Sequence, residues 1–190
     1  MTAPAGRLFV IAAPSGAGKT TLRDFLLTRH PDLYFSVSAT TRQPRPGEII
    51  HKDYHFMSRA EYDRHLAHGD FLEHAEVFGN LYGTLRQPIE DALRAGRNVL
   101  LDVDTKGARQ VKEKMPDAVL IFIMPPSMEE LERRLRRRNT DSEEVIQRRL
   151  REAGIEMDQR HFFDHMLVND NLETAQRQLE LLLYPPVQSA

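Results

Sequence analysis

The chain has 190 residues, a formal net charge of −2 and no cysteine, with 41% apolar and 28% charged residues. This composition is that of a folded globular protein with a substantial core, and the lack of cysteine excludes disulfides, thiolate metal sites and cysteine nucleophiles. The charge argues against a general nucleic-acid-binding protein, and the lack of a long apolar stretch or a signal-peptide pattern predicts a cytoplasmic protein with no membrane partner.

The first predicted element is a strand at residues 8–12, which runs into a loop of small residues. Backbone N–H groups of such a loop, together with a helix N-terminus, form a concave site for phosphate groups. Lys19 would reach the terminal phosphates of a nucleoside triphosphate, and the Thr20 hydroxyl would bind Mg²⁺. The general motif has glycine at position 13, where this chain has alanine. The residues predicted to bind ATP in this loop are Ala13, Pro14, Ser15, Gly16, Ala17, Gly18, Lys19, Thr20 and Thr21.

Further strands are predicted at 99–103 and 118–124, because nearly continuous apolar runs are typical of strands buried on both faces of a parallel sheet. Apolar residues at helical spacing follow the loop and predict a helix there, and a similar pattern that begins at Leu172 predicts another helix. Strands that alternate with helices predict a parallel sheet layered by helices, with ligands at the carboxyl ends of the strands.

Residues 34–84 differ in composition, since they are rich in Ser, Thr, Arg, Tyr and Gly. Segments with β propensity at 34–38, 54–56 and 71–78 surround a short helical pattern that begins at Ser58. The stretch therefore predicts a small mixed α/β insert beside the main sheet.

The segment from Ser36 to Glu48 reads Ser-Val-Ser-Ala-Thr-Thr-Arg-Gln-Pro-Arg-Pro-Gly-Glu, and it resembles the corresponding block of guanylate kinases. Similar blocks cover nearly the whole chain, at 13–22, 35–48, 52–56, 71–84, 100–112, 121–150 and 168–173. The resemblance implies a P-loop NTPase three-layer α/β fold in one domain over 1–190. Its parts would be a core at 7–33, 85–132 and 151–185, a GMP-binding insert at 34–84 and a helical lid at 133–150.

The resemblance also implies an enzyme, an ATP:GMP phosphotransferase that uses Mg²⁺. ATP and GMP would be its small-molecule partners. Deoxy-GMP is expected to serve as well, because no residue is assigned to the 2′-hydroxyl. The oligomeric state stays open.

Arg42 and Arg45 lie three residues apart, with Pro44 holding the backbone extended between them. Guanidinium groups suit phosphate oxygens, and Tyr54 and Tyr82 could each add a hydroxyl donor without adding charge. In the family these two arginines and two tyrosines hold the phosphate of GMP, and the resemblance implies the same role here. The alternatives to this role are that the two arginines are solvated surface charges and that Tyr82 only packs within the insert.

Base recognition is expected at Glu73, with Ser38, Thr84 and Asp104 assisting. Guanine presents N1–H and N2–H₂ donors on one edge, which match the two oxygens of an ionised carboxylate, whereas adenine presents an acceptor at N1. Glu76 is the local competitor for this role, and the family pattern favours Glu73.

Asp102 and Asp104 follow the apolar run at 99–103 and, being two residues apart, are expected on the same face. For this family we expect Asp102 near Mg²⁺ and the acceptor, and Asp104 toward the nucleoside. Which aspartate does which task stays undecided.

The resemblance assigns Arg134, Arg138 and Arg149 to the lid, where they would stabilise charge during phosphoryl transfer. Asn139 stands where the family usually has glycine. Asn169 would lie by the adenine of ATP, or it could simply form a turn before the last helix.

Two other functions remain open. One is a kinase on the same scaffold that phosphorylates a ribose bisphosphate, which would not need a guanine-reading carboxylate. The other is a non-catalytic guanylate-kinase-like binding module, which would lack the phosphate loop.

Overall fold

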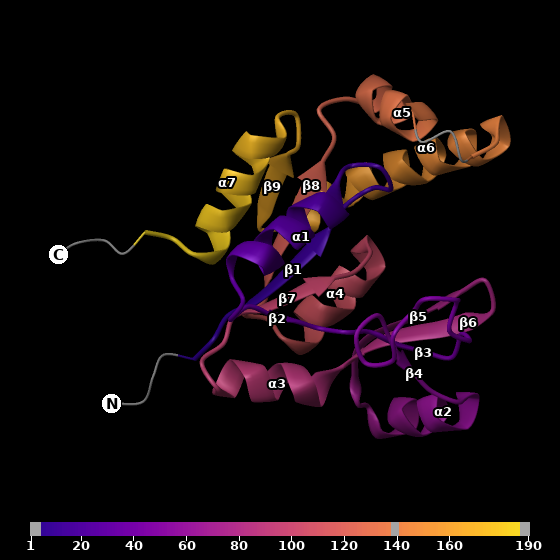
Figure 1. The fold of residues 1–190 in the computed structure, drawn as a ribbon, viewed down its shortest axis with the longest axis vertical. Helices are drawn as coiled ribbons and strands as arrows, with labels where there is room; N and C mark the ends of the chain where they lie inside the picture. The colour runs from indigo at the N-terminus through magenta and orange to yellow at the C-terminus, as the bar shows by residue number, and fades with distance from the viewer. Residues whose placement is uncertain (1–4, 138–140, 187–190) are drawn as a thin grey trace.

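The computed structural model describes residues 5–137 and 141–186, so Arg138 and Asn139 lie outside the described part. Five parallel strands form the main sheet (Figure 1). In spatial order these are β2 (Tyr34–Phe35), β7 (Val99–Asp102), β1 (Leu8–Ala12), β8 (Val119–Met124) and β9 (His165–Val168).

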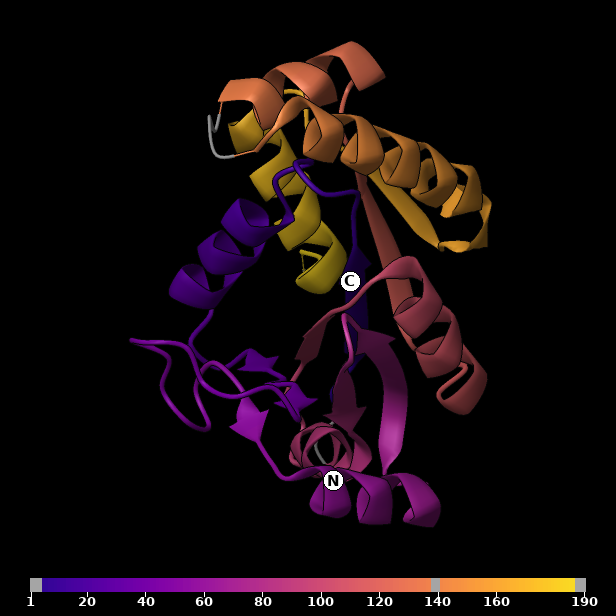
Figure 2. The ribbon, with the colours of Figure 1, turned by 90° about the vertical axis from the view of Figure 1, so that its right-hand side faces the viewer.

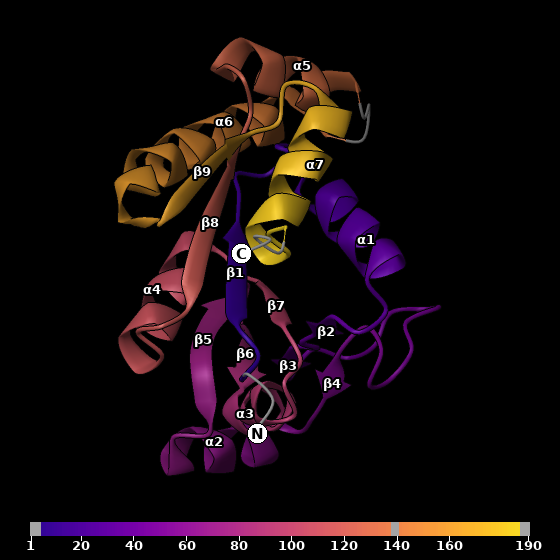
Figure 3. The same ribbon diagram turned by 90° about the vertical axis from the view of Figure 1, so that its left-hand side faces the viewer.

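Helices cover both faces of this sheet, because its central strands are apolar on both sides. Along β1, Val10 belongs to the apolar cluster on one face, while Phe9 and Ile11 belong to the cluster on the other. The helices α3 (Arg86–Arg94) and α4 (Thr105–Lys114) contribute to the first cluster. The helices α1 (Lys19–Arg29) and α7 (Leu172–Leu183) contribute to the second, and Figure 3 shows them on the side of β1 opposite to α4. The predicted three-layer α/β fold is confirmed.

The insert forms a second, four-stranded sheet with a small core of its own around Ala39, Tyr62 and Phe71. Its strands are β4 (His55–Phe56), β3 (Ala39–Thr40), β6 (Asn80–Leu85) and β5 (Phe71–Val77), in spatial order. Its helix α2 (Arg59–His68) begins where the sequence predicts, since the Ser58 hydroxyl caps it by accepting the Glu61 N–H at 3.2 Å.

The first residues of the predicted insert belong instead to the main sheet. Tyr34 and Phe35 pair in parallel with β7, and both side chains pack against the main apolar clusters. Pairing and burial thus attach this short strand to the edge of the main sheet, and the insert bounds of 34–84 stay a prediction.

The segment predicted as the lid falls on α5 (Met128–Arg137) and α6 (Glu143–Asp158), here called the lid helices after that prediction. They pack together through Leu131, Leu135 and Ala153. A 3₁₀ turn, η1 (Gln159–Phe162), leads from α6 into β9. Figure 2 shows the two lid helices at one end of the molecule and the insert at the other. Both helices reach beyond the predicted lid at 133–150.

Within residues 5–137 and 141–186, no helix combines the length and the apolar character needed to cross a bilayer.

Candidate active site

The loop between β1 and α1 borders a cavity of about 370 Å³, here called the phosphate-loop cavity. Gly16 and Gly18 have φ of 96° and 95°, a left-handed conformation that glycine adopts without steric cost. In the described part of the chain, the only residues other than glycine with positive φ are His51 and Phe78. Ala13 therefore does not adopt the left-handed conformation that would strain an alanine. The cavity is lined by Ala13, Pro14, Ser15, Gly16, Gly18, Lys19, Thr20, Thr21, Asp104 and Glu156.

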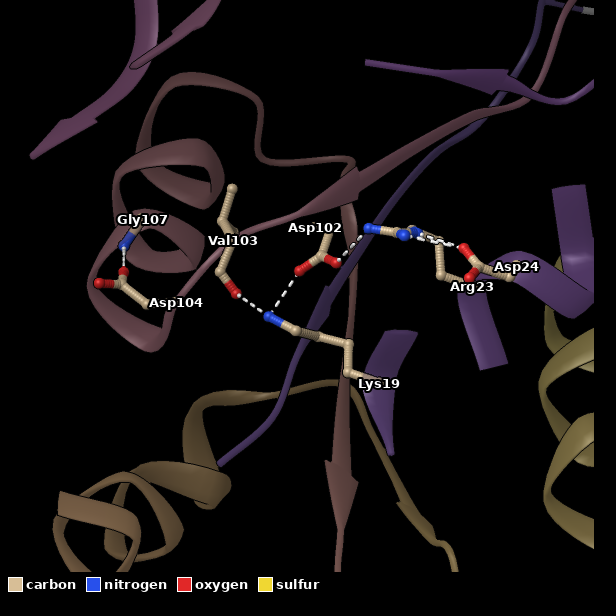
Figure 4. Close-up of polar contacts among 7 residues, drawn as sticks. All are labelled: Lys19, Arg23, Asp24, Asp102, Val103, Asp104 and Gly107. Atoms are coloured by element: carbon tan, nitrogen blue, oxygen red, sulfur yellow. Dashed lines mark hydrogen bonds and ion pairs between the residues drawn. The ribbon is translucent and has the colours of Figure 1, made fainter. Parts of the chain in front are cut away.

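Lys19 is the first residue of α1, and its ammonium group lies at the carboxyl end of β7 (Figure 4). Its Nζ is 2.5 Å from Oδ1 of Asp102 and donates a hydrogen bond to the Val103 carbonyl at 3.3 Å. Oδ2 of Asp102 lies 3.4 Å from Nη1 of Arg23, which also pairs with Asp24 at 2.8 Å. The carboxylate of Asp102 therefore lies between two cations.

Asp104 lies outside β7, because that strand ends at Asp102. It is the N-cap of α4, where its Oδ1 accepts the Gly107 N–H at 2.7 Å (Figure 4). Its side chain thus takes its orientation from the helix. Asp104 also lines both the phosphate-loop cavity and a second cavity beside the insert, so it stands at the wall between them.

The second cavity, here called the insert cavity, has a volume of about 180 Å³. Glu73 on β5 is only 7% exposed, and its Oε1 accepts a hydrogen bond of 2.5 Å from the Thr84 hydroxyl on β6. Burial raises the pKa of the Glu73 carboxyl, and the Thr84 hydrogen bond opposes that shift. Glu76, the competitor for base recognition, is exposed on the same strand. The insert cavity is lined by Ser38, Tyr54, Glu73, Ala75, Val77, Tyr82, Asp102, Val103 and Asp104.

Arg42 lies beside the tyrosines predicted to act with it. It forms two hydrogen bonds with Glu48, at 2.7 and 3.0 Å. Its guanidinium carbon lies 5.3 Å from the ring centre of Tyr54 and 5.7 Å from that of Phe56, which fixes the planar group against the insert. Arg45 is exposed, and its backbone N–H donates to Glu48 Oε2 at 2.7 Å. The structure thus brings Arg42 close to Tyr54, while the Arg45 side chain extends into solvent.

A third cavity, of about 340 Å³, continues from the phosphate loop toward the lid. It is lined by Thr21, Glu130, Arg133, Arg134, Arg137, Asn169, Asp170 and Leu172. Thr21 borders both this cavity and the phosphate-loop cavity. Arg134 donates to Glu130 Oε1 at 2.8 Å and to the Asn169 carbonyl at 2.9 Å.

Arg149, another predicted lid arginine, is not brought to the phosphate-loop cavity by this structure. Arg149 on α6 lies 3.0 Å from Oδ2 of Asp141, and it does not line that cavity. Arg138 falls outside the described residues. An approach of the Arg149 side chain to phosphates bound in that cavity therefore requires a rearrangement of α6.

Glu156 on α6 lines the phosphate-loop cavity, although no sequence motif indicates it. Burial raises the pKa of its carboxyl to about 7, against the opposing charge of Lys19. The carboxylates of Asp104 and Glu152 act in the same direction as burial. Glu48 and Arg23 are likewise not predicted as site residues from the sequence. Glu48 pairs with Arg42 and Arg23 pairs with Asp102, and these contacts become apparent only in the folded chain.

The predicted Mg²⁺ site fits the residues present. In the described ranges, no group of three or more His, Asp or Glu side chains is arranged to hold a metal by itself. Mg²⁺ commonly binds one or two protein oxygens together with substrate phosphates and water. Thr20 lines the phosphate-loop cavity and Asp102 lines the adjoining one, so these two oxygen donors suit an ion held partly by phosphates.

A phosphate loop at the carboxyl edge of a parallel sheet, with a second cavity sharing the wall at Asp104, defines a P-loop NTPase-type protein with two adjacent cavities. Comparison with known proteins narrows this class. The family model for guanylate kinase matches residues 5–184, and the chain belongs to the guanylate kinase family.

Relatives from several bacteria agree with this assignment. A guanylate kinase of Synechococcus sp. (strain JA-3-3Ab) is 52% identical over 181 residues, which are 95% of this chain and 83% of that protein. A guanylate kinase of Chromobacterium violaceum is 51% identical over 179 residues, 94% of this chain and 85% of that protein. The crystal structure of guanylate kinase from Anaplasma phagocytophilum is similar with a TM-score of 0.73 at 37% identity, covering 96% of this chain and 87% of that one. The resemblance seen in the sequence is confirmed.

Proposed function

We propose that this chain transfers the γ-phosphoryl group of ATP to the phosphate of GMP, giving ADP and GDP. The observation that carries this proposal is the buried carboxylate of Glu73, in a cavity that shares Asp104 with the phosphate-loop cavity. A guanine base at Glu73 and a triphosphate on the loop would bring two phosphate groups toward the same wall. Membership of the guanylate kinase family supports the same reaction.

ATP would bind through its phosphates to the loop from Ala13 to Thr21, whose backbone amides and helix N-terminus favour anions. Lys19 would contact the terminal phosphates. Thr20 and Asp102 would hold Mg²⁺, which supplies charge neutralisation between the phosphate oxygens. Because the Asp102 carboxylate already lies next to Lys19, both groups are close to where the two ligands would meet.

GMP would bind in the insert cavity. The ionised Glu73 carboxylate would accept the N1–H and N2–H₂ groups of guanine, with Thr84 holding one of its oxygens in place. Ser38 and Asp104 would complete the nucleoside site. The phosphate would be held by Arg42, Arg45, Tyr54 and Tyr82, for which the Arg45 side chain has to turn in from solvent.

In the transfer step, an oxygen of the GMP phosphate attacks the γ-phosphorus while the bond to the β,γ-bridging oxygen breaks, and that oxygen leaves with ADP. The attacking oxygen is already anionic, so the chain needs no general base. Arg134, Arg138 and Arg149 would stabilise the transferring charge after the lid closes, and closure would also exclude water.

An ADP-release assay over several acceptors tests the proposal. We expect activity with GMP and dGMP, and little with AMP or UMP. If a ribose bisphosphate is the only acceptor that causes ADP release, the result would favour the sister kinase. If nucleotides bind but no acceptor causes ADP release, the result would favour a non-catalytic module. Equal rates with AMP and GMP would contradict the role of Glu73. The cytoplasmic location and the absence of nucleic-acid and membrane partners stay predictions from composition.

A further inference from the structure

The side chain of Asn169, which follows β9 directly, points at the phosphate loop. Asn169 is 5% exposed, and its Nδ2 donates a hydrogen bond of 2.8 Å to the carbonyl of Ala17. Ala17 is fully buried, so this amide takes the place of water as the partner of that carbonyl. A Cβ placed on Gly18 would clash with the same Nδ2, which shows how closely the amide rests against the loop backbone.

The direction of the Ala17 carbonyl determines where the next backbone N–H, that of Gly18, points. The described peptide bonds are all trans, and in a trans peptide the C=O and the following N–H point in opposite directions. With its carbonyl fixed on Asn169, the Ala17–Gly18 peptide turns the Gly18 N–H away from Asn169. Gly18 lines the phosphate-loop cavity and is the N-cap of α1, so this N–H is one of the donors available to an anion there.

Asn169 is itself held firmly on both sides. Its backbone N–H donates to the Met124 carbonyl at 2.8 Å, at the end of β8. Its own carbonyl accepts a hydrogen bond of 2.9 Å from Arg134, whose Nε is bound to Glu130 on α5. The loop peptide is thus braced by a residue that the sheet and the lid helix both hold.

We propose that Asn169 is a positioning residue for the phosphate loop, which sets the Gly18 N–H for the donor phosphates whatever base the donor carries. This role differs from the adenine contact that the family resemblance implies, since a base contact would matter for one base only. The inference rests on the proposed function only in naming a nucleoside triphosphate as the ligand of this loop. It can be tested by binding, without any turnover.

The test compares Asn169→Asp with Asn169→Ala by calorimetric titration with ADP, IDP and pyrophosphate in the presence of Mg²⁺. Asn169→Asp keeps the volume of the side chain, but its carboxylate has no N–H to donate to Ala17. We expect all three ligands to bind about tenfold more weakly to both variants, which corresponds to the loss of about one hydrogen bond. GMP should bind as it does to the unaltered protein.

Asn171→Ala is the matched control. Asn171 lies two residues further on, is exposed, and caps α7 by accepting the Thr174 N–H at 3.0 Å. Its loss should lower the thermal unfolding temperature without changing the affinity for pyrophosphate. A loss of affinity in Asn171→Ala equal to that in Asn169→Asp would assign the effect to general destabilisation and overturn the proposal.

The Gly18 amide gives a second readout that a merely structural role would not change. In ¹⁵N-correlated spectra, pyrophosphate should shift the Gly18 N–H resonance of the unaltered protein, and the shift should be much smaller in Asn169→Asp. A loss confined to ADP would show that Asn169 contacts adenine and would overturn the inference, as would unchanged binding of all three ligands. If the unaltered protein binds none of them, the phosphate loop is not a donor site, and the proposed function fails together with this inference.

Discussion

The ammonium group of Lys19 lies 2.5 Å from the carboxylate of Asp102, and each residue lines a different cavity. Lys19 belongs to the phosphate-loop cavity, and Asp102 to the insert cavity in which Glu73 is buried. The ion pair therefore marks the boundary between the proposed donor and acceptor sites. A phosphoryl group that passes from one ligand to the other has to cross this boundary.

Replacing Lys19 should abolish most of the activity. Lys19→Met keeps the length and much of the packing of the side chain but removes the charge next to the phosphates. We expect kcat to fall by about 100-fold or more, the usual scale for losing one charge-stabilising donor in a transition state. Steady-state kinetics with ATP and GMP, together with circular dichroism to check folding, measure this.

Arg23→Met is the control for Lys19→Met. Arg23 lies 3.4 Å from the other oxygen of Asp102 and does not line the phosphate-loop cavity. Its loss should change kcat by less than about tenfold, because a partly exposed ion pair contributes little. Parental kcat in Lys19→Met, or equal losses in the two variants, would contradict the placement of the donor phosphates.

Removing the Thr84 hydroxyl should weaken GMP binding specifically. Thr84→Val deletes the hydrogen bond that holds Glu73 Oε1 at 2.5 Å. We expect KM for GMP to rise about tenfold, as for one hydrogen bond to a charged group, with KM for ATP unchanged. Thr84→Ser keeps the hydroxyl and should restore the parental KM. Similar KM values for GMP in the valine and serine variants would disprove this role.

The same pair of residues predicts a pH dependence. Burial raises the pKa of Glu73, and only the ionised carboxylate can accept both guanine donors. As the pH is lowered, KM for GMP should therefore begin to increase at a higher pH than an unperturbed glutamate would cause, while KM for ATP follows a flatter course. In Thr84→Val the increase should begin at higher pH, because the hydrogen bond that lowers this pKa is gone.

Glu156 should make the ligand-free protein less stable at alkaline pH. Its folded-state pKa of about 7 lies above the ordinary value of 4.5, so its favourable contribution is complete below about pH 4.5 and is lost as the pH rises through about 7. Glu156→Gln lacks that loss. The unfolding temperature of the variant, relative to the parent, should thus be higher at about pH 8 than at about pH 5.

Glu144→Gln is the control on the same helix, since Glu144 is exposed and does not line the phosphate-loop cavity. We expect its unfolding temperature to follow the parent at both pH values. If the unfolding temperature of Glu156→Gln differs from that of the parent by the same amount at both pH values, the pKa of the Glu156 carboxyl is not raised in the folded protein.

Arg149 should contribute to turnover more than to GMP binding. It pairs with Asp141 at the start of α6 and reaches the phosphates only if the lid rearranges. We expect Arg149→Met to lower kcat by about 100-fold with little change in KM for GMP, as for a group that acts only in the transition state. Arg148→Met, which removes an exposed neighbour paired with Glu152 at 3.8 Å, should leave kcat unchanged. A rise in KM alone would assign Arg149 to ground-state binding.

Elements with strong local signals could be predicted from the sequence. The apolar runs of β1, β7 and β8 and the cap at Ser58 follow from neighbouring residues alone. The strand β9 could not be predicted in this way, because it lies at the edge of the sheet and leaves Met166 and Val168 exposed. The two residues of β2 form a strand only through pairing with β7.

The residues of the candidate site likewise divide into those with a local sequence signal and those that depend on distant contacts. The loop from Ala13 to Thr21 is one continuous segment, so neighbouring residues alone are enough to predict a phosphate site there. The brace between Asn169 and Ala17 joins positions 152 residues apart, and no local pattern could indicate it. Glu156 becomes part of the phosphate-loop cavity only because α6 folds over it. Residues whose roles depend on such distant contacts had to come from the folded chain.

The specificity of Glu73 for guanine tests the account most directly. The measurement is kcat/KM for GMP and for AMP, in the parental protein and in Glu73→Gln. We expect the parent to prefer GMP by roughly 10⁴-fold, because a site built on hydrogen bonds leaves its polar groups unpaired with the wrong base. The variant should lose most of its activity with GMP and most of this preference. Unchanged GMP kinetics in Glu73→Gln would contradict the account.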